Sequence, residues 1–490
     1  MPNRTEAAQR KLSHGPPGGY SHCACSRLHI NWIPWAEKPP RTASFNVKLL
    51  VMSAHSVAPG AQQKRFAAYL NRLAQAAGHL DRVVPLKSYC TGLLLPGERK
   101  SVEPMAARLC PDHVRQTHQS LHHVVAHAPW RDEDILEAVR QYALPAMQKQ
   151  GPIEAWIVDD TGLVKKGTHS VGVTRQYCGQ VGKQENCRVA VSLSVSTREV
   201  SLPIAWRLYL PEVWAHDKKR RKATGIPPEI SFQTKPEIAL QQIRTALDRE
   251  IPTAPVLTDA AYGNDTGFRD GITELGLLYV VGIQSSVSVW KPGQAPLPKR
   301  KWKGIGRPTK LLRRDDKHAP VAVRELAMSL PSSDWKTVRW REGTRKPLRS
   351  RFAAVRVRTA HRDYWSSEPR PEEWLLIEWP KQEAEPTKYW LSTLPASTNL
   401  SDLVRLAKQR WIIERDYQEL KQELGLGHYE GRGWRGFHHH ATLCIAAYGF
   451  LVAERSRFFP SARAGQVDLP IPEMPLKFRP RGSPSARGAA

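Results

Sequence analysis

The sequence feature that most constrains the fold is the stretch 401–425, which has the pattern of one long helix. Ser401 is a favourable N-cap residue, and Gly425 suits the position just beyond a helix C-terminus. Six apolar residues recur at helical spacing: Leu403, Leu406, Ile413, Tyr417, Leu420 and Leu424. Such a stripe indicates that the helix lies against a hydrophobic core.

Three polar residues of this stretch fall on one narrow strip beside the apolar face. At about 100° per residue, Glu414 lies about 40° round from Arg410, and Lys421 about 20°. A carboxylate therefore sits between two cations along the helix axis. Spacing alone favours a surface salt-bridge ladder. A catalytic interpretation of the strip therefore depends on carboxylates elsewhere in the chain.

The net charge points to a polyanionic partner. The 490 residues include 73 Lys and Arg against 46 Asp and Glu, which gives +27 at pH 7. A surplus of this size favours nucleic acid binding, although a basic protein without such a partner stays open. Several of the 16 tryptophans stand beside cations, a pattern that suits stacking on bases and contact with phosphates: Trp290, Trp302, Trp340 and Trp434.

Cysteine usage and hydropathy argue against a secreted or membrane protein. The seven cysteines are scattered and contain no C-x-x-C pair, so neither a disulfide framework nor a zinc knuckle is indicated. No segment reaches the roughly 18 apolar residues of a membrane helix. We therefore expect a cytoplasmic protein with no membrane partner.

The triple histidine 438–440 is expected to begin a helix near DNA or solvent.

The pattern along the chain predicts an α/β fold. Residues 154–160, a hairpin of strands at 172–178 and 187–196, and a strand at 200–209 form the opening of an RNase H-like fold, a mixed sheet flanked by helices. A helix at 237–251 and an apolar strand at 254–262 follow.

Changes in composition divide the chain into six regions. At the end of the first region, Met52 is an alternative start of translation. The second region, which is helical, is either a domain that holds DNA or a cap that packs on the core. The regions are an irregular or disordered extension (1–52), a helical N-terminal domain (53–150), the first part of the catalytic core (151–285), a β-rich basic insertion (286–386), the second part of the core (387–457) and a disordered basic tail (458–490).

Carboxylates follow two of the predicted strands. Asp159 and Asp160 end the apolar run at 154–160, and Asp259 ends the later strand. Acids brought together repel one another, and a divalent cation relieves the repulsion. Oxygen-only ligands suit Mg²⁺ or Mn²⁺, and two such ions about 3.5–4 Å apart stabilise both oxygens in phosphoryl transfer.

Several motifs together resemble the bacterial insertion-sequence transposases of the DDE type, which have an RNase H-like core. The resemblance covers roughly residues 90–455. The matching residues are Asp159, Asp160, Thr161 and Gly162 with Lys165, Lys166 and Gly167; residues 170–179; Gly182, Lys183, Asn186 and Cys187; residues 208–211; Asp259 with Tyr262 and Gly263; and Arg410, Trp411, Ile413, Glu414, Leu420 and Lys421.

The resemblance implies which residues act. It assigns the catalytic and metal-binding acids to Asp160, Asp259 and Glu414, with two Mg²⁺ ions that Mn²⁺ can replace. Asp159 competes for the first position, because neighbouring residues of a strand face opposite sides. In the family's Y-R-E-K helix signature Arg410, Glu414 and Lys421 match, but Ala407 stands at the tyrosine position. Arg410 and Lys421 would bind DNA phosphates.

The resemblance also implies a reaction and its partners. The expected activity is cleavage at the ends of a mobile element, followed by attack of the freed 3′-hydroxyl on target DNA, in the bacterial nucleoid. The expected partners are terminal inverted repeats, target DNA and a second copy of the chain in a synaptic complex. A structure-specific endonuclease on the same fold and a non-catalytic DNA-binding protein derived from a transposase stay open, as does cleavage through a hairpin.

Overall fold

The computed structural model describes residues 60–302, 304, 310–341 and 347–458. The predictions for 1–52, including Met52, and for 459–490 lie outside these residues. The described residues belong to one compact unit, so the expected divisions at 150, 285 and 386 stay predictions.

The first described part of the chain is helical. Three acids open its last helix, where a negative charge is favourable beside the N-terminal end of the helix dipole: Asp132, Glu133 and Asp134. The apolar faces of these helices pack together and against the long C-terminal helix. The elements are α2 (Ala61–Ala76), α3 (Leu80–Leu94), α4 (Val102–Leu109), η1 (Pro111–His113), α5 (Val114–Ala126) and α6 (Asp132–Gln150).

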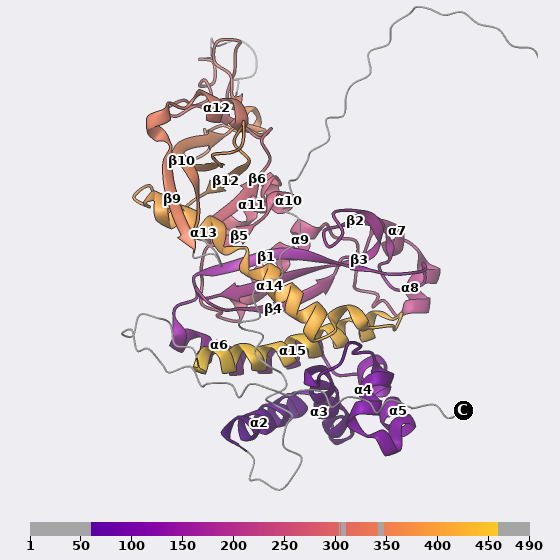
Figure 1. Cartoon of the computed structure of the whole chain (residues 1–490). Helices are drawn as coiled ribbons and strands as arrows, with labels where there is room; N and C mark the ends of the chain where they lie inside the picture. The colour runs from indigo at the N-terminus through magenta and orange to yellow at the C-terminus, as the bar shows by residue number, and fades with distance from the viewer. Residues whose placement is uncertain (1–59, 303, 305–309, 342–346, 459–490) are drawn as a thin grey trace, which may run out of the picture. The chain divides into compact units, whose positions relative to one another are not determined.

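The central sheet has the strand order of an RNase H-like fold, which confirms the predicted fold class (Figure 1). Its central strand β1 (Ala155–Val164) pairs antiparallel with β3 and parallel with β5, which in turn pairs parallel with β6. β3 also pairs with β2 and β4. The bounds are β2 (Thr174–Cys178), β3 (Lys183–Ser196), β4 (Ser201–Leu208), β5 (Val256–Thr258) and β6 (Tyr279–Ile283).

The insertion continues this same sheet. β12 pairs antiparallel with β6, and β11 and β10 follow in order, with β7, β8 and β9 beyond. The β-rich stretch therefore extends the core sheet. Its elements are β7 (Ser288–Trp290), β8 (Val321–Ala322), α12 (Val323–Ser329), η2 (Ser332–Asp334), β9 (Lys336–Arg341), β10 (Leu348–Thr359), η3 (Asp363–Trp365) and β11 (Glu373–Trp379), and it joins the core through β12 (Lys388–Ser392).

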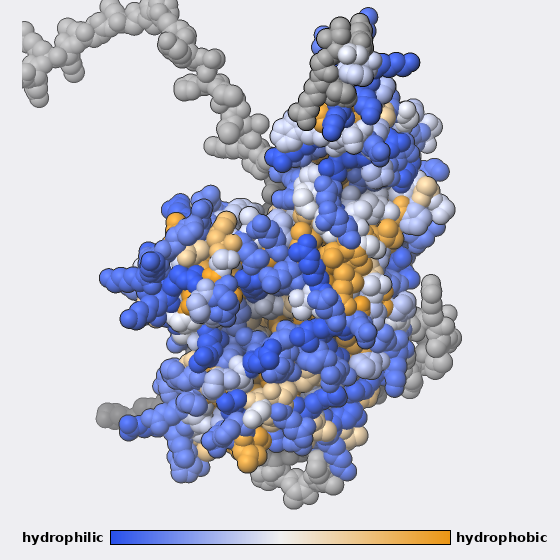
Figure 2. All heavy atoms as spheres, turned by 180° about the vertical axis from the view of Figure 1, so that it is seen from behind, coloured by the Kyte–Doolittle hydropathy of each residue, from blue (hydrophilic) through white to orange (hydrophobic). Residues whose placement is uncertain are grey.

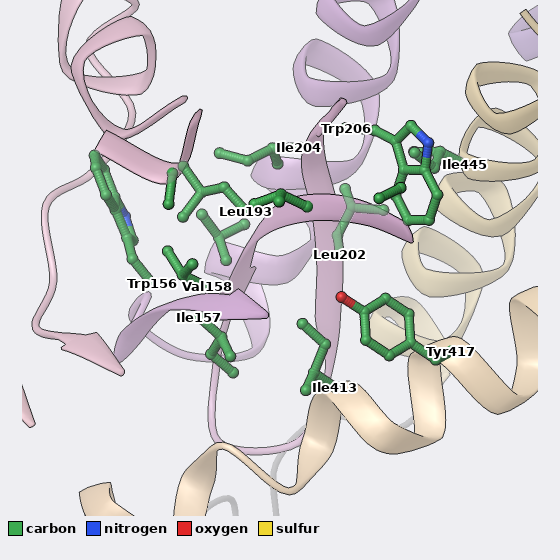
Figure 3. Packing of buried hydrophobic residues seen from close by; sticks show 14 of the residues in the cluster. Trp156, Ile157, Val158, Leu193, Leu202, Ile204, Trp206, Ile413, Tyr417 and Ile445 are labelled. Carbon is green, nitrogen blue, oxygen red and sulfur yellow. The ribbon is translucent and has the colours of Figure 1, made fainter. Parts of the chain in front are cut away.

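Helices cover both faces of the core strands. On one face, the Tyr417 hydroxyl hydrogen-bonds to Ser192 of β3, and Ile413 and Tyr417 point toward the sheet (Figure 3). On the other face, Gln242 of α9 donates to the carbonyl of Val191. The helices are α7 (Glu212–Ala215), α8 (Lys218–Thr224), α9 (Lys235–Asp248), α10 (Ala260–Gly263), α11 (Thr266–Glu274), α13 (Leu400–Gln409), α14 (Ile412–Gln418) and α15 (Trp434–Phe458). None of the described helices is both long and apolar enough to cross a membrane.

The stretch predicted as one helix is three successive pieces. α13 ends at Gln409, Arg410 and Trp411 form a turn, and α14 gives way to the π-helix η4 (Glu419–Glu423). Asn399 is the N-cap, because its side chain accepts a hydrogen bond from the backbone of Asp402. The six apolar residues of the predicted stripe are all buried, as expected, and Gly425 ends the stretch at a φ of 70° ahead of η5 (Leu426–His428).

The triple histidine lies in the core, and the prediction of a solvent or DNA contact is wrong. His438, His439 and His440 are 8%, 2% and 2% exposed within α15. Each finds polar partners there: His438 accepts from the backbone N–H of Leu208, and His440 hydrogen-bonds to Tyr89. Burial lowers their pKa values to about 4, 3 and 3, so all three are neutral at pH 7.

We expect Gly263→Ala to lower the free energy of unfolding by about 1–3 kcal/mol, the usual cost of overpacking. A Cβ on Gly263 would lie 1.9 Å from the carbonyl oxygen of Gly282, a backbone atom that cannot turn away. Thermal or urea unfolding measures the change. Gly179→Ala is the matched control, because a Cβ there meets nothing within 4 Å; equal stability of the two variants would contradict the packing argument.

Candidate active site

The two adjacent acids lie in the middle of β1. The sequence placed them at the end of a strand, but β1 continues to Val164 because β3 pairs with its whole length. Alternation along the strand sends Asp159 and Asp160 to opposite faces of the sheet. The two carboxylates therefore have different surroundings, and these can be compared directly.

Asp259 lies beside Asp159. β1 and β5 are parallel neighbours, with Trp156 opposite Val256 and Ile157 opposite Leu257. Extending this register by two residues places Asp259 next to Asp159, about 4.8 Å away across the ladder and on the same face. Asp259 also caps α10, because its Oδ1 accepts from the backbone N–H of Ala261 at 2.9 Å.

One guanidinium connects the acids of this face. Arg410, in the turn between α13 and α14, forms an ion pair through Nη1 with Oδ2 of Asp159. Its Nη2 lies 3.9 Å from Oε1 of Glu414, whose side chain is 71% exposed. The structure therefore brings Asp159, Arg410 and Glu414 together, with Asp259 adjacent through the sheet.

The charges of these groups influence one another. Burial raises the pKa of Asp159 to about 7; Arg410 acts against this rise, while the carboxylates of Asp259 and Asp160 add to it. Burial also opposes the charge of Arg410, but Asp159, Asp259 and Glu414 together raise its pKa. This is a site with an excess of negative charge that one arginine partly neutralises.

Asp160 has other partners. Its Oδ2 accepts from Nζ of Lys235 at 2.9 Å and lies 3.4 Å from the hydroxyl of Tyr262. Lys235 is the first residue of α9, whose N-cap Thr234 and residue Glu237 form a capping box that fixes this end of the helix. Asp160 is therefore held by a lysine on the face opposite Arg410.

Lys421 lies on the π-helix and contacts β1. Its Nζ donates to the carbonyl of Gly162 at 2.9 Å and to the side chain of Gln180 at 3.3 Å. Burial lowers its pKa to about 8. Lys421 and Arg410 thus both have protein partners in this structure, and their predicted binding of DNA phosphates stays a prediction.

The insertion also contacts the turn that carries Arg410. The guanidinium of Arg341, the last residue of β9, lies 3.7 Å from the ring centroid of Trp411, and Arg415 of α14 approaches the same ring at 5.8 Å. Trp411 stands between Arg410 and Glu414 in the chain, so this stacking links the insertion to the position of both.

The donor set suits a hard divalent cation. Asp159, Asp259 and Glu414 offer only carboxylate oxygens, the ligands that Mg²⁺ and Mn²⁺ prefer, and the mutual effect of Asp159 and Asp259 is one that a cation would relieve. Within the residues described, no group of three or more His, Cys, Asp and Glu side chains is close enough to enclose a metal ion. Glu414 is exposed, and its ion-pair partner is Arg410. Its side chain is the one that would have to move to complete a metal site.

Comparison with known proteins identifies the family. A family model described as DDE superfamily endonuclease matches residues 72–347, more than half of the chain. The chain belongs to this family. The match includes the strands that carry Asp159, Asp160 and Asp259, and it ends before α13.

A curated relative points in the same direction. Over 169 residues the DDE endonuclease described here is 32% identical to a protein named as a probable transposase for insertion sequence element IS701 from Microchaete diplosiphon. The aligned part is 34% of this chain and 41% of the relative. The chain thus matches about two fifths of the relative's length.

Sequence reasoning missed the partners of Asp160. Lys235 and Tyr262 come from elements far from β1 in the sequence, and no spacing rule connects them to it. A partial signal was present, since Thr234, Pro236 and Glu237 mark a helix start, which places the side chain of Lys235 at that helix end. The choice between the two acids depended on the register of β5, which the sequence does not encode locally.

We expect Asp159 and Arg410 to be coupled by about 0.5–3 kcal/mol in a double-mutant cycle. Asp159→Asn removes the nearest partner of the arginine, and Arg410→Gln leaves a mostly buried carboxylate, so each single change removes the pair at one end. The double variant should lose less stability than the two single changes combined. Chemical unfolding of the four proteins measures the coupling, and additivity would show that the pair contributes nothing.

Proposed function

We propose that this DDE endonuclease is a transposase that cuts DNA at the ends of an insertion sequence and joins the 3′-hydroxyl ends to target DNA. The observation that carries the proposal is the placement of Asp259 beside Asp159, with Arg410 linking Asp159 to Glu414. The likeness to the IS701 relative and the net charge of +27 support DNA as the substrate.

The proposed metal ligands are Asp159, Asp259 and Glu414. Asp160, favoured by the sequence, is replaced by Asp159 because Asp160 lies on the opposite face, paired with Lys235, whereas Asp159 shares a face with Asp259 and Arg410. When bound, two Mg²⁺ ions, or Mn²⁺ in their place, would stabilise the attacking and leaving oxygens of phosphoryl transfer. The exposed Glu414 on α14 can complete this set by a change of side-chain rotamer.

The other residues of the site hold this arrangement. Arg410 favours the charged form of Asp159 and orients its carboxylate before DNA arrives. A guanidinium is also the side chain best suited to a phosphate, so Arg410 can contact a DNA strand at the same place. Lys421 fixes the π-helix to the backbone of β1 through Gly162, and Asp160 with Lys235 anchors the start of α9. In this proposal a second copy of the chain joins in a synaptic complex with both terminal repeats.

Two other functions make different predictions. A structure-specific endonuclease would cut DNA but would not join a pre-cut 3′-hydroxyl end to a target. A non-catalytic DNA-binding protein would bind DNA and cut none. Cleavage and strand-transfer assays on the same preparation distinguish the three.

We expect Asp159→Asn and Asp259→Asn to abolish metal-dependent DNA cleavage and to leave DNA binding largely intact, because affinity comes from the Lys and Arg surface. Asp160→Asn is the matched control: it is adjacent on the same strand and should keep most of the activity. Cleavage of labelled DNA and a binding titration measure both effects. Loss of cleavage in Asp160→Asn with activity in Asp159→Asn would reverse the assignment.

Glu414→Gln should likewise abolish cleavage, whereas Glu423→Gln, an exposed change on the adjoining π-helix, should not. A chelator such as EDTA should stop cleavage by the wild-type protein, and excess Mg²⁺ or Mn²⁺ should restore it. Pre-cut DNA ends with free 3′-hydroxyls should then be joined to a plasmid target. Cleavage that persists in EDTA would refute the metal-dependent mechanism, and cleavage without joining would favour the endonuclease.

A further inference from the structure

A groove lies between α5 and the segment that follows the π-helix. Two hollows of about 410 Å³ and about 370 Å³ share lining residues, among them His122 and Tyr429. Because they share these residues, the two hollows adjoin and are described together as one groove. One wall is α5, with His118 and His122, and His127 just beyond it; residues 428–436 form another wall, and residues 99–104 line the first hollow. We name it the α5 groove.

The α5 groove carries positive charge that faces solvent. Arg99, Arg432 and Arg435 are exposed along it, against the acids Glu103 and Glu430. Arg99 is paired with Glu430, and Arg435 donates one hydrogen bond to a backbone carbonyl just beyond α5. The guanidinium of Arg432 has no hydrogen-bond partner among the residues that the structure describes. Two arginines therefore remain available to an anion.

The second wall of the groove is firmly built. The carbonyl of Tyr429 accepts from Nζ of Lys165 at 2.6 Å, and the carbonyl of Arg432 accepts from the backbone N–H of Val171 at 2.9 Å. A Cβ on Gly431 or Gly436 would lie 2.1 or 1.7 Å from the Tyr429 hydroxyl. The loop therefore follows the ring closely, and a ligand meets a preformed surface that needs little ordering.

The wall is joined to the catalytic strand. Lys165 lies six residues beyond Asp159 and directly follows β1. At about 3.3 Å per residue this is about 20 Å along the strand. Successive phosphates of one DNA strand rise by about 3.4 Å along the helix axis, so about six nucleotides span the same distance.

We propose that the α5 groove binds the sugar–phosphate backbone of duplex DNA whose end is cut at Asp159. The inference rests on the proposed function, since it takes DNA as the substrate of the site. Arginines with free N–H donors on a preformed loop suit phosphate oxygens, which lie at regular intervals along a duplex. Contacts of this kind position DNA without reading its sequence. They fix how far the duplex lies from the acids.

An acidic segment of another protein would also suit a basic groove. If such a segment occupies the groove, changes to the groove residues should leave DNA binding unaffected. One experiment therefore distinguishes the two occupants. Most of the face shown in Figure 2 is hydrophilic, and the chain has 73 Lys and Arg. Cations are therefore common in this protein, so the experiment must separate the effect of their position from the effect of their number.

The experiment compares two variants that each lose two cations. Arg432→Ala/Arg435→Ala changes the α5 groove, and Arg72→Ala/Lys149→Ala changes exposed residues of α2 and α6 that do not line it. Fluorescence anisotropy measures binding of a labelled duplex of arbitrary sequence, roughly 30 bp long, from about 50 to about 200 mM salt. Equal melting temperatures of all three proteins establish that they are folded.

Each phosphate contact contributes about 0.9 to the slope of log K against log salt, so the groove variant should lose about two units of slope and bind more weakly. The control variant should keep the wild-type slope. If the double variant is unstable, Arg432→Ala alone should lose about one unit, and Arg432→Lys should restore it. Equal slopes for groove and control variants would overturn the proposal, and would leave an acidic protein segment as the better occupant.

The outcome is separable from that of the proposed function. A wild-type protein that cuts DNA while its groove variant binds DNA normally contradicts only the groove. A wild-type protein that cuts no DNA, but whose binding depends on Arg432 and Arg435, contradicts the transposase and retains the groove as a DNA-binding surface.

Discussion

The ion pair between Arg410 and Asp159 is the contact on which the site depends. A carboxylate in the middle of a central strand is costly to bury, and a second acid beside it raises the cost. One guanidinium from the opposite layer reduces this cost and joins the sheet to the turn between α13 and α14. The same residue reaches Glu414. The guanidinium that pairs with Asp159 therefore also lies near the exposed carboxylate of Glu414.

The sequence predicted the elements of this core well because their signals are local. Apolar runs with strand or helix spacing lie within 10–15 residues, and the buried apolar stripe of 403–424 and the fold class are as expected. The strand bounds are less exact: β1 runs on to Val164, and the strand expected at 254–262 is β5 at Val256–Thr258 followed by helix α10. Local signals do not indicate whether Asp159 or Asp160 lies beside Asp259. This depends on the register of β5 against β1, a contact between segments about 100 residues apart.

Other features could not be predicted because tertiary partners determine them. A triple histidine is polar in any propensity scale, yet each ring of 438–440 finds hydrogen-bond partners inside the core, so burial becomes tolerable. No proline or glycine marks the interruption of the helix at Arg410. It coincides with the contacts of Arg410 to β1 and of Trp411 to β9, which lie outside the helix itself.

The position of the insertion in the sheet explains its structural role. Without the insertion, β12 would be an edge strand with unpaired backbone groups; β11 of the insertion pairs with that edge, and β12 leads on toward α13. Lys408 of α13 is paired with Glu378 of β11 and lies near the rings of Trp340, Phe352 and Trp390. Separating the two partners of a buried ion pair leaves an uncompensated charge, which is strongly destabilising. The insertion thus holds α13 in place, and Arg410 follows directly from the end of that helix.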